Sequence, residues 1–215
     1  LQETMIIKLR KTNHKPAYIT ITSTNSNKDF SEITSFQAPY DIVVCGKDKY
    51  VYLVTNSEEV ETLRQLNQWN NTLPSLGLKM KAGLTVDFRN REALRNTAEE
   101  TAVPLFYSQH IQSGKVIFPI GKEHEYLVTE QSGLLQKNAN YLFVKRFTAK
   151  EEHRRLQCGV YLSRKYPGYK QISTQNKINF IDGLKGLSEC VVYGLYVLFN
   201  STMFFLCGKT LYEQI

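Results

Sequence analysis

The chain has 215 residues, of which 42% are hydrophobic and 12% aromatic, so it carries enough apolar material for a packed core. This composition excludes a wholly disordered or collagen-like chain. Lysine and arginine number 27 against 20 aspartates and glutamates, which gives a formal net charge of +7. That excess is compatible with an acidic partner such as nucleic acid, and equally with a charged face that only contacts solvent.

The excess of basic residues is concentrated in one segment. Residues 143–170 contain eight basic and two acidic side chains, and the cations alternate with aromatic residues such as Phe143, Phe147 and Tyr161. Cations can hold phosphates, and flat aromatic groups can pack against sugars or bases. The segment is therefore the first candidate for a nucleic-acid contact.

Several features bear on the cellular environment. None of the four cysteines belongs to a Cys-x-x-Cys pair, and each lies in an apolar run, so we expect buried, reduced thiols in a cytoplasmic protein. The longest apolar stretch, residues 190–206, is interrupted by Asn200, Ser201 and Thr202, and we expect no membrane span. The chain begins at Leu1 without a methionine and ends without a polar tail, which suggests a fragment of a longer protein.

The N-terminal quarter is expected to be rich in strands. Alternating or continuous apolar residues predict strands at 4–10, 17–24, 40–45 and 49–54. Asn56 can cap a following helix, which has Glu58 and Glu59 in its first turn and apolar residues at helical spacing after them.

The remaining chain mixes strands with a second helix. Strands are predicted at 84–88, on both sides of a Gln112-Ser113-Gly114 turn, at 140–147 and, half-buried, at 156–163. Residues 187–199 have the length and apolar density of a packed helix. The expected fold class is α+β, with mixed or antiparallel strands and a few packed helices.

No catalytic constellation is present in the sequence. It has no Gly-x-Gly-x-x-Gly, no Gly-Lys-Ser/Thr loop and no serine nucleophile elbow. The histidines are scattered; His124, between Glu123 and Glu125, could bind a metal ion, but a solvated turn fits it better. We assign no catalytic, cofactor-binding or metal-binding residue.

One run of residues resembles a known family. NYLFVKRFTAKEEHRRL, at residues 140–156, resembles a segment in the target-recognition half of bacterial adenine-specific DNA methyltransferases from type II restriction–modification systems. Weaker matches follow the order of that family: LQETMIIKLR, AGLTVDFRNREAL, VPLFYSQHIQSGKVIFP, NKINFI and GLYVLFNST. The resemblance spans roughly residues 1–202, and the chain departs from the family pattern after Thr202.

The resemblance implies that the chain contains parts of two functional domains of a longer protein. Residues 1–55 would end the catalytic domain of the parent enzyme, and residues 56–215 would form its DNA target-recognition domain. The S-adenosylmethionine site and an Asn-Pro-Pro-Tyr loop for the extruded adenine would precede Leu1, so this chain would hold no cofactor. Its partners would be double-stranded DNA and the catalytic domain, and the parent would methylate the exocyclic amine of adenine.

The residues predicted to contact DNA are mostly in the basic segment. Glu151 and Glu152 could instead pair with some of these cations, Asn179 and Asn200 could hold backbone turns, and Arg89 could pair with Asp87 at the surface. Two other functions remain open: a nucleic-acid-binding or specificity module of another restriction system without methyl transfer, and a protein-interaction domain with an incidental basic face. The predicted DNA-binding residues are Lys145, Arg146, Lys150, Arg154, Arg155, Arg89, Asn179 and Asn200.

Overall fold

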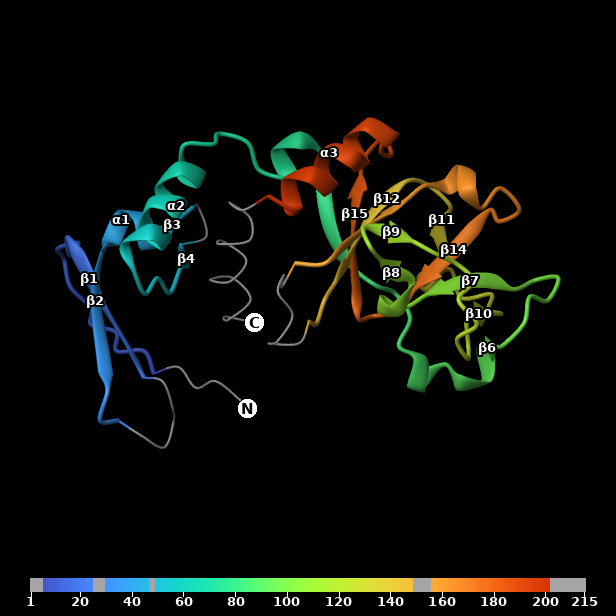
Figure 1. Cartoon of the computed structure of the whole chain (residues 1–215), viewed down its shortest axis with the longest axis horizontal. Coiled ribbons are helices and arrows are strands. Elements are labelled where there is room, and N and C mark those ends of the chain that lie inside the picture. The colour runs from blue at the N-terminus through green and yellow to red at the C-terminus, as the bar shows by residue number, and fades with distance from the viewer. Residues whose placement is uncertain (1–5, 25–29, 47–48, 149–155, 202–215) are drawn as a thin grey trace. The chain divides into compact units, whose positions relative to one another are not determined.

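A computed structural model describes residues 6–24, 30–46, 49–148 and 156–201. Within them the chain forms two compact units, which divide between Asn70 and Asn71. Figure 1 shows the elements of each unit along the chain. The assignment of residues 1–55 and 56–215 to two functional domains remains a prediction.

The first unit is built on an antiparallel pair of strands. β1 (Tyr18–Thr24) pairs with β2 (Ile33–Pro39) over its whole length. Alternate positions of β1 and β2 turn inward, and Ala38 is fully buried beside Val43 and Val54. The unit continues through α1 (Tyr40–Val43), β3 (Val44–Cys45), β4 (Tyr50–Val51) and α2 (Ser57–Asn67).

Helix α2 begins where the sequence predicts it. The Asn56 side chain accepts a hydrogen bond from the Glu59 backbone N–H at 2.9 Å, and the Glu59 carboxylate accepts one from the Thr55 backbone N–H at 2.7 Å. These reciprocal bonds satisfy donors that the first helical turn leaves free. Val60 and Leu63 are buried against the core of the unit, as their spacing predicts.

Two predicted strands of the first unit are wrong. Residues 6–10 of the expected strand 4–10 form no strand, and Ile6 and Leu9 are exposed. Residues 40–43 form the helical turn α1 instead of a strand. Pro39 is compatible with the helical turn that follows it, because its φ of −60° is already close to the helical value and its missing N–H is not needed at a helix start.

The second unit contains a six-stranded sheet. Its order is β5-β15-β12-β13-β9-β8, and every neighbouring pair is antiparallel except β13 and β9. β12 lies near its middle, which accounts for the buried run that the sequence shows there (Figure 1). The strands are β5 (Leu78–Ala82), β8 (Ile111–Gln112), β9 (Lys115–Val116), β12 (Tyr141–Lys145), β13 (Cys158–Tyr161) and β15 (Ile178–Gly183).

A five-stranded sheet and a helix complete this unit. The order of the second sheet is β11-β14-β7-β10-β6, in which only β14 and β7 run parallel. These strands are β6 (Leu94–Arg95), β7 (Val103–Phe106), β10 (Tyr126–Leu127), β11 (Gln136–Lys137) and β14 (Gln171–Thr174). The helix is α3 (Glu189–Phe199), and the short 3-10 helices are η1 (Pro74–Leu76), η2 (Asp87–Arg89), η3 (Arg91–Ala93), η4 (Ser108–His110), η5 (Ser132–Leu134) and η6 (Ser163–Lys165).

Aromatic side chains from both sheets share one core. The ring of Phe106 in β7 lies 5.2 Å from that of Tyr161 in β13, and Tyr161 stacks on Phe143 in β12 at 5.1 Å. Ile172 of β14 and Phe180 of β15 belong to the same cluster. On its other face, β13 contacts α3. The prediction that β13 is half-buried is therefore wrong, because it has a neighbouring layer on each face and all four of its residues are buried.

Two further predictions need correction. Residues 84–88 form no regular strand: Thr85 makes a single bridge to Gln175, and η2 follows. The extended segment ends because the chain turns into η2 at Asp87. Cys190 is exposed on α3 rather than buried, because it lies off the helix face formed by Val192, Leu195 and Phe199.

The other elements predicted for this unit are present. β8 and β9 pair across Ser113 and Gly114, both of which have positive φ, as a tight hairpin turn requires. Ser188 caps α3 by accepting a hydrogen bond from the Val191 backbone N–H at 3.3 Å. The α+β fold class is confirmed. No helix in the described part of the chain is long and apolar enough to span a bilayer.

Candidate nucleic-acid interface

The basic segment of the sequence does not form one surface patch. Lys145 and Arg146 lie at the end of β12, whereas Arg164 and Lys165 follow β13 in η6. Because β12 and β13 are antiparallel, with Tyr141 opposite Tyr161, these two pairs of cations lie at opposite ends of the sheet. Lys150, Arg154 and Arg155 lie outside the described residues.

Further polar residues join Lys145 and Arg146 at their end of the sheet. The Arg146 backbone N–H donates to the Lys177 carbonyl at 2.9 Å, and Lys145 lies opposite Ile178 in β15. Lys177 thus comes next to β12 from the turn between β14 and β15. Lys145, Arg146 and Lys177 form no ion pair with any other described residue, and Glu151 and Glu152, the acids that could pair with these cations, lie outside the described residues. We call these three residues the basic end.

A polar pocket of about 280 Å³ adjoins the basic end through Lys177. Gln175, whose side chain is almost fully buried, holds the turn that carries Lys177. The Gln175 Oε1 atom accepts from the Lys177 backbone N–H at 3.1 Å, and its Nε2 group makes a long contact of 3.4 Å with Asp87 Oδ2. The residues that line the pocket are Asp87, Tyr107, Ser108, Gln109, Lys122, Gln175 and Lys177.

One wall of the pocket rests on a buried pair, His110 and Glu125. The His110 Nδ1 atom accepts from the Tyr107 backbone N–H at 2.8 Å, so its proton is on Nε2, which donates to Glu125 Oε1 at 2.7 Å. The carboxylate also accepts from the backbone N–H groups of Ile120 and Gly121, at 2.8 and 3.0 Å. Burial lowers the pKa of His110, although Glu125 acts in the opposite direction. The pair therefore fixes η4, with a neutral imidazole beneath it.

Tyr107 connects this buried pair to the surface. Its hydroxyl donates to the His124 carbonyl at 3.0 Å, and the Lys122 ammonium lies 4.1 Å from its ring centroid. Burial, followed by the charges of Asp87 and Glu125, raises the pKa of the phenol, so it stays protonated. Both side chains, Tyr107 and His110, are buried. No sequence pattern indicates Glu125 as the partner of His110.

The other predicted DNA contacts lie in different surroundings. Arg89 is exposed in η2 beside the pocket residue Asp87, and it packs on the Phe88 ring at 5.5 Å rather than pairing with any described acid. Asn179 lies opposite Val144, one position from the basic end, and is partly exposed. Asn200 ends α3: its Nδ2 group donates to the Tyr196 carbonyl at 2.8 Å. The Asn200 side chain thus holds the backbone at the end of α3, which is the alternative to DNA contact.

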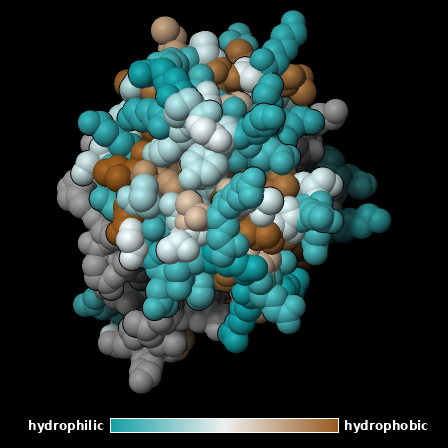
Figure 2. All heavy atoms as spheres, turned by 90° about the vertical axis from the view of Figure 1, so that its right-hand side faces the viewer, coloured by the Kyte–Doolittle hydropathy of each residue, from teal (hydrophilic) through white to brown (hydrophobic). Residues whose placement is uncertain are grey.

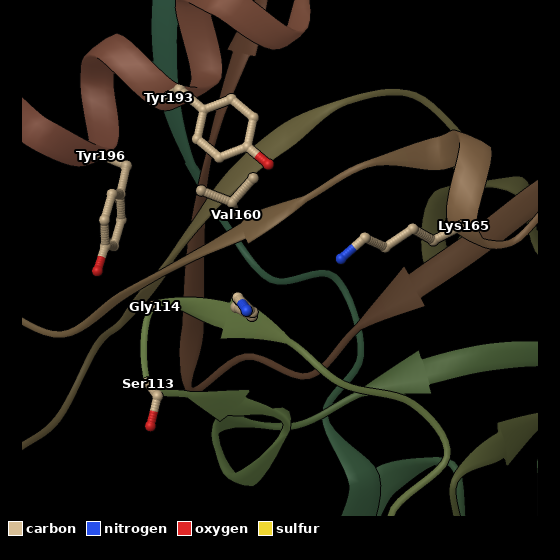
Figure 3. A pocket seen from close by; sticks show the side chains of 7 residues that line it. Ser113, Gly114, Val160, Lys165, Tyr193 and Tyr196 are labelled. Atoms are coloured by element: carbon tan, nitrogen blue, oxygen red, sulfur yellow. The ribbon is translucent and has the colours of Figure 1, made fainter.

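The opposite end of the sheet holds a smaller pocket, of about 140 Å³, between α3 and the β8–β9 hairpin. Figure 3 shows Tyr193 and Tyr196 descending from α3 toward Gly114, with Lys165 at the side. Nearby Arg164 pairs with Glu189 at 2.5 Å, which reduces the free positive charge there. This end is therefore less suited to an anionic ligand than the basic end. The lining residues are Ser113, Gly114, Lys115, Val160, Lys165, Tyr193 and Tyr196.

The described residues give little support to a metal site or to a broad apolar interface on the face viewed in Figure 2. Within that part of the chain, no three His, Cys, Asp or Glu side chains gather where they could hold a metal ion. His124 lies in a turn with φ of 65° and is exposed. On the face in Figure 2, hydrophilic side chains predominate and apolar ones occur in small separate groups.

Comparison with known proteins gives a consistent result. The chain is 32% identical to the type II methyltransferase M.PstI of Providencia stuartii over 213 aligned residues, which cover 94% of the chain and 41% of that enzyme. It is 34% identical to the type II methyltransferase M.BsuBI of Bacillus subtilis over 209 residues, again 94% of the chain and 41% of the enzyme. The chain is homologous to part of these methyltransferases. It spans about two fifths of their length. No family model and no solved structure matches it.

Proposed function

We propose that the chain is the DNA target-recognition portion of an adenine-specific type II methyltransferase. The observation that carries this proposal is the similarity to M.PstI and M.BsuBI over 94% of the chain. The basic end supports it, because three cations without acidic partners among the described residues lie together where β12 ends and β15 begins. Such cations hold the phosphates of a duplex, and polar groups beside them can reach base edges.

We assign the methyl donor, S-adenosylmethionine, and the catalytic residues to the portion of the parent protein that corresponds to the rest of the relatives, because this chain spans about two fifths of their length. That portion is also the proposed covalent partner of this chain.

Binding to duplex DNA tests the role of the basic end. A double variant, Lys145→Ala with Lys177→Ala, should weaken the affinity of the chain for a fluorescent 20-base-pair duplex roughly 60-fold at about 100 mM salt, if each lysine neutralises one phosphate. The matched control is Lys137→Ala with Lys170→Ala, which removes the same charge from the far end of β14. The control should bind like the wild type. Equal losses in both variants, or no binding by the wild type, would contradict the proposal.

Methyl transfer is tested on the longer protein that contains this chain. We expect it to convert adenine to N6-methyladenine in duplex DNA when S-adenosylmethionine is supplied, measured by mass spectrometry of the digested DNA. Binding of DNA without any methylated base would favour the alternative of a specificity module that does not transfer methyl groups.

A further inference from the structure

The polar pocket contains one side chain that is suited to reading a base. Gln109 is exposed on η4, and the two hydrogens of its Nε2 group have no acceptor among the described residues. Its Oε1 atom has only a long contact, 3.3 Å, with the Ser108 hydroxyl. A free amide offers a donor and an acceptor side by side, the combination that pairs with N7 and N6 of adenine in the major groove.

The backbone that carries Gln109 is held rigidly. Its neighbours Tyr107 and His110 are joined by the 2.8 Å bond from the Tyr107 N–H to the imidazole, and Glu125 anchors the imidazole from below. Glu125 is itself held by two backbone N–H groups. A base-reading group needs a fixed orientation, because a hydrogen-bonded fork tolerates little misplacement. The buried pair fixes the backbone position from which the Gln109 side chain extends.

The charges around the pocket fit the same ligand. Lys122 and Lys177 line it, and the latter belongs to the basic end, so phosphates on either side of a base could be held while an edge is presented to Gln109. Asp87 is the acid among the lining residues, and it disfavours phosphate inside the pocket itself.

We propose that Gln109 reads the edge of an adenine in the recognised DNA sequence, with His110 and Glu125 as positioning residues. This inference rests on the proposed DNA-binding function and adds the residue and the base that it recognises. This contact would serve to recognise the DNA sequence, and Gln109 would take no part in methyl transfer.

The test is a selection of bound duplexes from a pool with a randomised core, using the whole 215-residue chain. The wild type should enrich adenine at one position by roughly 5- to 150-fold, the discrimination typical of one bidentate pair. Gln109→Ala should lose this enrichment, while its affinity for unselected DNA stays unchanged. Gln109→Glu should move the preference toward cytosine, whose amino group donates to a carboxylate. The control is Gln171→Ala, an exposed glutamine at the far end of β14, which should select like the wild type.

Glu125→Gln separates positioning from folding. It keeps the size of the side chain, and its amide oxygen can still accept from His110 and Ile120, but its NH2 group cannot accept from the Gly121 backbone N–H as the second carboxylate oxygen does. The support of His110 should loosen, so the adenine enrichment should weaken at the same position as in Gln109→Ala and nowhere else. Equal weakening at every position would overturn the positioning role. Identical selections by Gln109→Ala, Gln109→Glu and the wild type would overturn the proposed reading residue and leave the DNA-binding function intact. Absence of binding by the wild type would overturn both.

Discussion

The imidazole of His110 is kept neutral by its surroundings, and this should make the stability of the protein depend on pH. Burial lowers its pKa in the folded state, whereas in the unfolded chain it titrates near the ordinary value of 6.5. Below pH 6.5 the unfolded state therefore binds more protons, so the free energy of unfolding should fall with decreasing pH, by at most about 1.4 kcal/mol per pH unit. Urea midpoints at pH 7.5 and 5.5 should show a smaller difference in His110→Gln than in the wild type. Equal differences would mean that His110 does not contribute to this dependence.

Two glycines with similar backbone angles should respond differently to alanine. Gly114 and Gly121 have φ of 78° and 76°, so either substitution incurs strain of about 1–2 kcal/mol. A Cβ at Gly114 would also lie 2.1 Å from the Tyr196 hydroxyl, whereas nothing lies within 4 Å at Gly121. Gly114→Ala should therefore lower the free energy of unfolding more than Gly121→Ala, as measured by urea denaturation. Tyr196→Ala removes the side chain that this Cβ would meet. In that background, Gly114→Ala and Gly121→Ala should lower the free energy of unfolding by similar amounts.

Individual site residues were predictable only where a local pattern marked them. Lys145 and Arg146 stand out because they end an apolar strand, and the structure places them at one end of the sheet. Lys177 and Gln109 lie far from them in sequence and carry no motif, so only the pairing of β12 with β15 and the fold of η4 bring them nearby. Arg164 and Lys165 show the reverse. They are closer in sequence to Lys145 and Arg146 than Lys177 is, but they lie at the opposite end of the sheet.

Among the elements, the caps should contribute measurably and independently of DNA binding. Asn56 accepts from the Glu59 N–H at 2.9 Å at the start of α2, and Asn56→Ala should cost about 1 kcal/mol of stability. The basic end belongs to the other compact unit, so the affinity of this variant for DNA should equal that of the wild type when both are folded. Chemical denaturation, followed by a DNA titration at fixed salt, measures both quantities. If Asn56→Ala weakened DNA binding as much as Lys145→Ala with Lys177→Ala does, the helix cap and DNA binding would not be independent.

The elements also show where sequence patterns suffice. The hairpin at Ser113 and Gly114, the strand β12 and helix α3 are specified by local turn residues, continuous apolar character and a capping serine. The buried character of β13 depends on a helix and a second sheet from elsewhere in the chain, and its own alternation predicts only one buried face. Residues 84–88 likewise have strand-like composition, but they make a single bridge, from Thr85 to Gln175, before the chain turns into η2 at Asp87.

At the scale of the whole molecule, the placement of charge matters more than its total. A net charge of +7 would attract DNA to any face, and then every lysine pair would count equally. If Lys145, Arg146, Lys177 and Lys122 each neutralise a phosphate, the logarithm of affinity should fall against the logarithm of salt concentration with a slope of about −3.6. Lys145→Ala with Lys177→Ala should change that slope to about −1.8, since two of the four contacts are lost. Lys137→Ala with Lys170→Ala, which lowers the net charge equally, should leave the slope unchanged. The measurement is fluorescence anisotropy with one duplex across a series of salt concentrations. If the two double variants flatten the slope equally, the protein binds DNA through its net charge, and the basic end has no special part in holding the duplex.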